Sequence, residues 1–212
     1  MRSDLRTTTE PGEPTRSLEV EIKLDVDAET VAPDWCLLPG VAELSAPQVR
    51  ELDARYFDTS DFALGRAGYA LRRRTGGPDA GWHLKGPRQG AGRVELGWPL
   101  GEGESIPAAL KAEIRRITDD PLHPIARVRN RRLAVEMRDA AGGVVAEFLD
   151  DRVQTRDEAT GTERAWREWE IELGPAAPPD AEDFLRLIAD LARNAGARPA
   201  SSESKIGRAL GR

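Results

Sequence analysis

Acidic and basic side chains recur at every second position in several short segments of this sequence. In the first of these, residues 18–24, Glu19, Glu21 and Lys23 alternate with apolar residues. Successive residues of a β-strand face opposite sides, so the three charged side chains share one face and the apolar ones share the other. Two carboxylates and an ammonium on one strand face could bind a cation and an anion together.

Later segments repeat this alternation, so several strands are expected to carry charge on one face and apolar side chains on the other. Such a sheet is expected to close on itself, with the charges around a water-filled lumen and helices over the apolar face. The charged residues that follow the pattern are Arg72 and Arg74, His83 and Lys85, Arg93 and Glu95, and Glu168, Glu170 and Glu172.

These motifs resemble the CYTH family, the triphosphate tunnel metalloenzymes. The shared pattern is Glu-x-Glu-x-Lys at residues 19–23, Leu-Arg-x-Arg at 71–74, Trp-x-Leu-Lys at 82–85 and Glu-x-Glu-x-Glu at 168–172. The likeness runs from about Leu18 to Lys205. The family includes inorganic triphosphatases, thiamine triphosphatases and class IV adenylate cyclases, so the resemblance implies a closed antiparallel barrel of about eight strands with helices outside, an α+β fold.

The acidic residues predict a metal site. Carboxylates directed into one space repel each other, and a divalent cation removes that cost. Ligand sets made only of oxygen favour Mg²⁺ or Mn²⁺ over Zn²⁺. Among the acids named below, Asp150 has Asp151 and Glu147 as alternatives. Which of the glutamates at residues 168–172 bind the metal is left open. The candidate ligands are Glu19, Glu21, Glu95, Asp150, Glu168, Glu170 and Glu172.

The basic residues predict a phosphate site, because arginine forks match phosphate oxygens bidentately and lysine supplies a point charge. The resemblance assigns the catalytic grip on the triphosphate to Lys23, Arg72, Arg74 and Lys85, while Arg73 has the opposite parity and is expected outside. We expect acids on one side of the lumen and bases on the other. Further candidates for binding phosphate are Arg93, Arg131 with Arg129 as second choice, and the C-terminal Lys205.

Composition narrows the class of protein. The 212 residues suit one domain, predicted over residues 17–212 after a disordered leader at 1–16. The net charge of −6 gives no global attraction to nucleic acid or membranes, and no secretory signal or membrane span is evident. Cys36 is the single cysteine, so an internal disulfide is excluded and a cytoplasmic location is expected. The protein is expected to be a monomer or a homodimer.

Periodicity and turn residues predict the elements between the motifs. Residues 87–92 are predicted to form a flexible loop, and Ser201 or Ser202 is predicted to cap a final helix that carries Lys205. Further helices are predicted at 28–38, 107–118 and 181–193. Strands are predicted at 18–25, 48–58, 68–75, 81–86, 93–100, 125–137, 144–149 and 165–173.

Three functions fit this pattern. The first is a metal-dependent phosphohydrolase that cleaves inorganic triphosphate or a small organic triphosphate, with bases orienting the substrate and Mg²⁺ neutralising developing charge while water attacks the terminal phosphorus. The second is a class IV adenylate cyclase, which forms cyclic AMP and pyrophosphate from ATP. The third is a non-catalytic module that binds polyphosphate. The set of acids favours an enzyme over the third function, because binding a phosphate chain needs only the bases.

Overall fold

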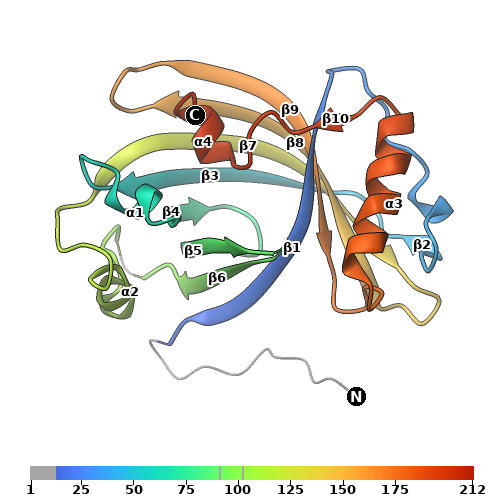
Figure 1. Ribbon diagram of the computed structural model, residues 1–212, viewed down its shortest axis with the longest axis horizontal. Helices are drawn as coiled ribbons and strands as arrows, with labels where there is room; N and C mark the ends of the chain where they lie inside the picture. Colours follow the sequence, from blue (N-terminus) through green and yellow to red (C-terminus); the bar gives the residue numbers. More distant parts are fainter. Residues whose placement is uncertain (1–12, 91, 102) are drawn as a thin grey trace. The chain divides into compact units, whose positions relative to one another are not determined.

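Strands make up most of the regular secondary structure (Figure 1) in the computed structural model, which describes residues 13–90, 92–101 and 103–212. Residues 51–58, 127–134 and 150–157 alternate exposed or half-buried positions with buried ones, whereas residues 81–84 and 168–171 are buried at every position. The strands are β1 (Thr15–Val26), β2 (Glu43–Leu44), β3 (Gln48–Asp58), β4 (Ala70–Thr75), β5 (Gly81–Gln89), β6 (Gly92–Pro99), β7 (His123–Arg138), β8 (Val144–Asp157), β9 (Glu163–Leu173) and β10 (Arg198–Pro199).

One sheet contains all ten strands found in the described residues, and it closes on itself. Its order is β10-β1-β6-β5-β4-β3-β7-β8-β9, with β2 added to β7 and a further pairing between β1 and β9. Because β1 also pairs with β9, eight of the strands form a ring. The fold is therefore the closed antiparallel β-barrel with helices that the sequence predicts, and closure removes the free edges of those strands.

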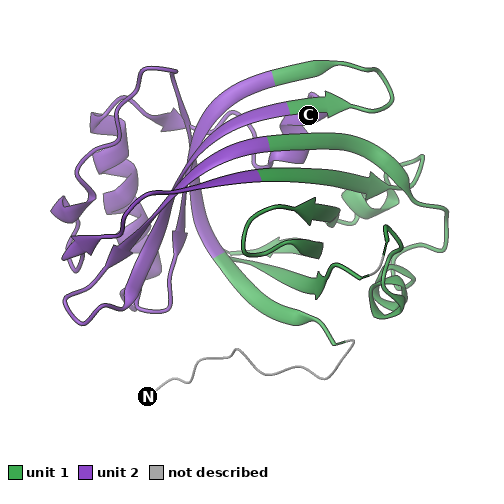
Figure 2. Ribbon diagram, turned by 180° about the vertical axis from the view of Figure 1, so that it is seen from behind, with its two compact units in different colours: residues 1–19, 52–129, 155–164 green, residues 20–51, 130–154, 165–212 purple. Residues whose placement is uncertain are grey.

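The chain divides into two compact units, which are coloured separately in Figure 2. Unit 1 contains residues 1–19, 52–129 and 155–164, and unit 2 contains residues 20–51, 130–154 and 165–212. Each unit has its own hydrophobic core. The long strands run through both units, with one part of each strand in unit 1 and the rest in unit 2. The charged residues are therefore described unit by unit.

The core of unit 1 forms between the β4–β5–β6 strands and two short helices, α1 (Ala63–Arg66) and α2 (Ala108–Ile114). Leu64 of α1 and Leu110 of α2 are fully buried against Leu71 and Trp82. Pro107 precedes the first helical residue of α2, where its missing N–H removes no intrahelical bond. The predicted helix at 107–118 is thus confirmed in a shorter form.

The core of unit 2 forms around α3 (Ala181–Asn194), whose residues Phe184, Ile188 and Ala192 recur at helical spacing and are buried. The side chain of Asp180 accepts a hydrogen bond from the backbone N–H of Asp183 (3.0 Å), which caps the first turn of α3. Two shorter helices, η1 (Trp35–Leu37) and α4 (Lys205–Ala209), complete the unit. None of the helices in the described part of the chain has the length and apolar character that a membrane crossing needs.

Three predicted elements differ from the structure. Residues 28–38 hold only the single turn η1, because Pro33 lacks an N–H and disfavours helical backbone in the residue before it. The predicted loop at 87–92 is largely strand, since β5 continues to Gln89 past an irregularity in its pairing with β6 between Lys85 and Arg88. The predicted leader lies mostly outside the described residues, and β1 begins at Thr15, inside its predicted range.

Candidate functional site

The pairing of β1 with β9 brings the two predicted acidic motifs together in unit 2. The two strands are antiparallel, with Glu21 opposite Glu172, Lys23 opposite Glu170, and Asp25 opposite Glu168. Residues directly opposite each other project from the same face of a sheet. The Glu-x-Glu-x-Lys and Glu-x-Glu-x-Glu motifs are therefore neighbours in space although about 150 residues separate them in sequence.

Glu170 lies at the centre of this group, buried beneath three basic side chains. Its carboxylate pairs with the ammonium of Lys23, with Arg132 Nη2 (2.6 Å) and with Lys205 Nζ (2.8 Å). Burial alone would raise the pKa of Glu170, but Lys205, Lys23 and Arg132 outweigh it and hold the pKa well below its usual range. Glu170 is thus an anion in a buried site.

Asp151 extends the group from β8. It is fully buried and accepts two hydrogen bonds from Arg132, through Nε and Nη2 at 2.7 Å each, and its Oδ2 lies 2.9 Å from Lys205 Nζ. Burial opposes ionisation, but Lys205 and Arg132 keep the pKa of Asp151 below its usual value. Lys205 also pairs with Glu168 Oε1 (2.5 Å), so its ammonium contacts three carboxylates.

The chemistry of these donors fits a divalent cation. The carboxylates form two sets of three, and within each set one oxygen per residue lies within 4.8 Å of the others. One set is Glu21, Glu170 and Glu172, and the other is Asp151, Glu168 and Glu170. Oxygen-only donors suit Mg²⁺ or Mn²⁺. The five carboxylates repel one another, and a bound divalent cation would reduce that repulsion. We call the following residues the acidic cluster: Glu21, Asp151, Glu168, Glu170 and Glu172 with Lys23, Arg132 and Lys205.

Unit 1 holds a second charged group, centred on the buried Glu95. Its carboxylate lies 3.3 Å from both Arg72 Nη2 and Lys85 Nζ, and it contacts His83 Nδ1 (2.7 Å). Burial would raise the pKa of Glu95, but Arg72 and Lys85 outweigh it and lower the pKa strongly. Lys85 also contacts Glu19 Oε2 (2.6 Å).

Two arginines on β4 supply further basic groups in unit 1. Arg74 pairs with Asp79. The buried Nε of Arg72 has no hydrogen-bond partner in the part of the chain that the structure describes. A buried donor in this condition is costly, and an anion such as a phosphate oxygen would satisfy it.

In both units the acids and bases are interleaved, which corrects the expected separation into an acidic and a basic side. Glu19 and Glu95 contact Lys85 in unit 1, and Glu170 contacts Lys23 in unit 2. The physical reason is that a buried charge is tolerated only with a partner of opposite sign.

His83 gives the protein an expected dependence of stability on pH. Its ring nitrogens contact Glu95 and the carbonyl oxygen of Asp79 (2.9 Å), two acceptors that favour a charged ring. Burial outweighs Glu95 and, with the neighbouring Arg72, lowers the pKa of His83 below 6.5. On unfolding, the ring regains its ordinary pKa and binds a proton more readily, so its contribution to stability is full above pH 6.5 and is lost as the pH falls below it.

We therefore expect the free energy of unfolding, measured by urea denaturation, to fall between about pH 7 and pH 5. His83→Gln should flatten this decline, whereas replacing the exposed His123 in the same way should leave it unchanged. Stability that rises on acidification would show instead that the charged ring is bound by Glu95 and Asp79.

Asp150 does not join the acidic cluster, and the structure places its neighbour Asp151 there. The Asp150 carboxylate accepts two hydrogen bonds from Arg167, at 2.8 and 2.7 Å. Glu147, the other alternative, pairs with Arg50 (2.8 Å). Adjacent strand residues face opposite sides, and Asp151 shares its parity with the buried Leu149 and Val153.

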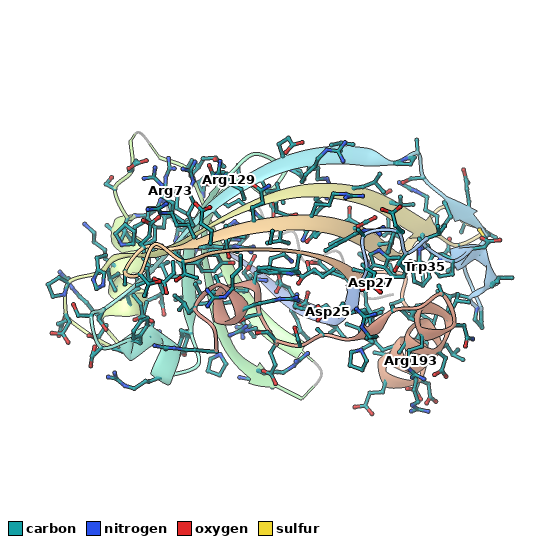
Figure 3. The ribbon with its side chains drawn as sticks, turned by 90° about the horizontal axis from the view of Figure 1, so that it is seen from above. Asp25, Asp27, Trp35, Arg73, Arg129 and Arg193 are labelled. Atoms are coloured by element: carbon teal, nitrogen blue, oxygen red, sulfur yellow. The ribbon has the colours of Figure 1, made fainter. Side chains whose placement is uncertain are left out.

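Among the predicted arginines of β7, Arg129 and Arg131 are exposed, and Arg129 is labelled in Figure 3. Arg131 makes only a surface ion pair with Glu51 (3.5 Å). The buried arginine is Arg132, which sequence reasoning missed. The apolar residues that follow could have identified Arg132. Val135 and Met137 belong to the core beside α3, and Arg132 has the other strand parity, so it faces the opposite side of β7.

Three other predicted residues are placed by the structure. Arg93 is not in either charged group, because its guanidinium donates to the backbone carbonyls of Gly86 and Gly68. Arg73, which is labelled in Figure 3, has the opposite strand parity to Arg72 and lies 3.9 Å from the exposed Glu104, as expected. Lys205 begins α4, and Ser204 caps that helix in place of the predicted Ser201 or Ser202.

Comparison with known proteins supports this reading of the motifs. Two uncharacterised proteins of Mycobacterium tuberculosis, Rv2226 of strain H37Rv and MT2285 of strain CDC 1551, are each 39% identical to the chain over 210 residues. The match covers 93% of this chain and 41% of theirs, so the chain spans about two fifths of the length of these relatives.

Solved structures with the same fold are more distant in sequence. A candidate adenylate cyclase from Bacillus halodurans has a TM-score of 0.60 at 20% identity, covering 91% of this chain and 97% of that one. PH1819 of Pyrococcus horikoshii OT3 gives 0.58 at 15%, covering 91% and 98%. HpAC1 of Hippeastrum, a candidate adenylyl cyclase with a dominant triphosphatase activity, gives 0.51 at 17%, covering 91% and 95%. Residues 17–206 match the model of the CYTH domain, and the chain therefore belongs to the CYTH domain family.

Proposed function

We propose that this protein is a divalent-metal-dependent phosphohydrolase that cleaves inorganic triphosphate or a small organic triphosphate. The observation that carries the proposal is the acidic cluster, where the carboxylate oxygens of five acids stand beside the buried Arg132 and the half-buried Lys23 and Lys205. A site that binds polyphosphate alone needs only the bases. CYTH-domain proteins are often enzymes that act on triphosphates, and the dominant triphosphatase activity of HpAC1 is in keeping with this proposal.

Specific roles follow from the contacts. Glu21, Glu168, Glu170, Glu172 and Asp151 would hold the cation. When bound, Mg²⁺ or Mn²⁺ supplies neutralisation of the negative charge on the phosphate oxygens. In this assignment Asp151 takes the place of Asp150 as a metal ligand. Glu19 and Glu95 contact Lys85 of unit 1, so we assign them to holding that base in place instead of binding the metal.

The basic side chains would bind and orient the phosphates. Arginine guanidinium groups can hold two phosphate oxygens at once, whereas lysine ammonium groups act as point charges. Fixed orientation of the phosphate chain lets water form a bond to the terminal phosphorus while the bridging P–O bond breaks, and the proton of that water passes to solvent or a phosphate oxygen. Beside the acidic cluster the bases assigned to this role are Lys23, Arg132 and Lys205. For Arg72, Arg74 and Lys85 of unit 1, binding of phosphate stays the prediction from their motifs.

A class IV-type adenylate cyclase is the second candidate function, because solved structures of the same fold include candidate adenylate cyclases. Identification of the products separates the two. The protein would be incubated with Mg²⁺ or Mn²⁺ and with inorganic triphosphate, thiamine triphosphate, ATP or long-chain polyphosphate in turn. Orthophosphate released from a triphosphate supports the hydrolase, cyclic AMP with pyrophosphate supports the cyclase, and binding of polyphosphate without turnover supports neither.

Metal binding should be visible without any substrate. Because a cation would reduce the repulsion among the carboxylates of the acidic cluster in the folded state only, Mg²⁺ or Mn²⁺ at a hundredfold excess over its Kd should stabilise the protein by about 2.7 kcal/mol. For a domain of this size, that corresponds to a rise in Tm of roughly 5–10 °C. Chelation should reverse the rise and abolish turnover. A Tm that ignores both cations would contradict the metal assignment.

A further inference from the structure

The C-terminal helix α4 carries a second ion-paired base besides Lys205, and this base contacts β1 next to the acidic cluster. Arg208 lies three residues after Lys205, so both side chains leave the same side of the short helix. Arg208 Nη1 contacts Asp25 Oδ1 at 2.5 Å, and Lys205 Nζ contacts Glu168 Oε1 at 2.5 Å. Asp25 and Glu168 are directly opposite each other on β1 and β9.

This pairing matches two bases to two acids. Like charges at directly opposed positions of a sheet repel each other, so Asp25 and Glu168 destabilise the β1–β9 pair when unaccompanied. Lys205 and Arg208 supply one positive charge to each. Asp25 Oδ2 also accepts a hydrogen bond from the backbone N–H of Ser201 (3.1 Å), which holds the segment that leads into α4.

An aromatic side chain completes a closed loop of contacts. The guanidinium of Arg208 lies over the ring of Trp166, with its central carbon 4.5 Å from the ring centroid, a cation–π arrangement. The indole N–H of Trp166 donates to Glu168 Oε2 at 2.5 Å, and the other oxygen of Glu168 contacts Lys205. The contacts therefore run from Arg208 through Trp166 and Glu168 to Lys205, which returns to Arg208 along α4.

We propose that Arg208 is a positioning residue for Lys205, acting with Asp25 and Trp166 as a clasp that holds the Lys205 ammonium against the acidic cluster. Asp25 is labelled in Figure 3. Arg208 contacts none of the carboxylates that could hold the cation; it acts through the placement of α4. The consequence for catalysis rests on the proposed function, in which Lys205 binds phosphate. The placement itself does not depend on that function.

Amine footprinting tests the placement directly, because the chain has four lysines: Lys23, Lys85, Lys111 and Lys205. Acetylation by an N-hydroxysuccinimide ester in the presence of chelator, followed by peptide mass spectrometry, gives a rate at each. Lys111 is exposed and serves as the internal reference, whereas Lys205 is only 12% exposed and fully ion-paired. Arg208→Ala should raise the acetylation rate of Lys205 relative to Lys111 by roughly fivefold or more, through more frequent opening of α4.

Arg198→Ala is the matched control. Arg198 also pairs with an aspartate close to the end of β1, Asp27, but the pair is exposed and is not on α4, so this variant should label like the wild type. Asp25→Asn removes the charge that Arg208 contacts at nearly constant volume, and should reproduce the effect of Arg208→Ala. An unchanged Lys205 rate in both variants, or an equal rise at Lys23, would overturn the clasp, since the latter would report general loosening of β1 and β9.

Kinetics add an arm that depends on the proposed function. With triphosphate turnover established, Arg208→Ala should lower it nearly as much as Lys205→Ala does, and the double variant should be no worse than Lys205→Ala alone, as expected for residues that act as a unit. Arg208→Lys should restore part of the loss, because it keeps the charge facing Asp25 but not the planar contact with Trp166. Additive losses would contradict the clasp. Absence of turnover in the wild type would refute the proposed function, and footprinting would still decide the placement.

Discussion

Replacing Glu170 by glutamine is expected to have the largest effect of any single substitution in the acidic cluster. Its carboxylate contacts Lys23, Arg132 and Lys205, and Gln keeps the shape of the side chain but removes the charge that all three bases share. Breaking a buried ion pair by removing one partner costs about 3–5 kcal/mol. We expect a loss of this size in the free energy of unfolding, measured by urea denaturation at pH 7.

The same substitution should also remove cation binding and turnover. Glu170 belongs to both sets of carboxylates that could hold a metal, so its loss affects either arrangement. Loss of a group that stabilises developing charge typically lowers kcat by about 10²–10³-fold. Isothermal calorimetry with Mn²⁺ and a phosphate-release assay would measure the two effects separately.

Glu163→Gln on the same strand is the matched control. Glu163 is exposed and its pair with Arg156 spans 3.4 Å, so the change should alter stability by less than about 1 kcal/mol and leave turnover intact. Wild-type metal affinity and turnover in Glu170→Gln would place the functional site away from the acidic cluster.

Replacing Arg132 by alanine should have the second-largest effect, while the same change at Arg131 should have almost none. Arg132 donates two hydrogen bonds to the fully buried Asp151 and one to Glu170. Its loss leaves two buried carboxylates undercompensated, at a cost of about 3–5 kcal/mol. Arg131 is exposed beside Glu51, and surface substitutions of this kind usually change stability by within about 0.5 kcal/mol.

The comparison of these neighbours also tests the phosphate assignment. Turnover of triphosphate should fall by roughly 10²–10³-fold in Arg132→Ala, the range for loss of one preorganised charged donor, and should be unchanged in Arg131→Ala.

Because Arg132 compensates Asp151 and Glu170, acid denaturation should begin at a higher pH in Arg132→Ala. In the wild type, the pKa values of Asp151 and Glu170 are lowered by folding. The stability that these two carboxylates provide is therefore present above their ordinary pKa values and is lost as the pH falls below them. A larger effect of Arg131→Ala would mean that β7 presents the other face to the site, and equal effects would contradict the special role of Arg132.

The alternation of charged and apolar residues predicted the fold from sequence alone, together with the strand face on which each charged side chain lies. Period-2 patterning fixes which side chains share a strand face, because a shift of one residue would bury the charges and expose the apolar side chains. This is why Arg72 and Arg73 were placed on opposite faces of β4, and why Glu21, Lys23 and Glu170 were expected to share a site.

Where a strand is buried on both faces, alternation no longer separates the two sides. In β7 the consecutive residues Ala134 and Val135 are both buried, and in β8 so are Phe148 and Leu149. Val135 and Phe148 belong to the core beside α3, while Ala134 and Leu149 share the parity of Arg132 and Asp151 on the charged side of the sheet. The resemblance to the family suggested Asp150, with Asp151 or Glu147 as alternatives, and Arg131, whereas Asp151 and Arg132 lie in the acidic cluster.

The partners of the charged residues were decided by tertiary structure alone. Spacing along one chain gives the parity of each side chain, but it does not say which acid meets which base across the sheet. Lys205 lies 35 residues after Glu170 in sequence, and only the return of α4 to β9 brings its ammonium within 2.8 Å of that carboxylate. Because buried charges must be paired, the fold interleaves acids with bases where the sequence suggested separate acidic and basic sides.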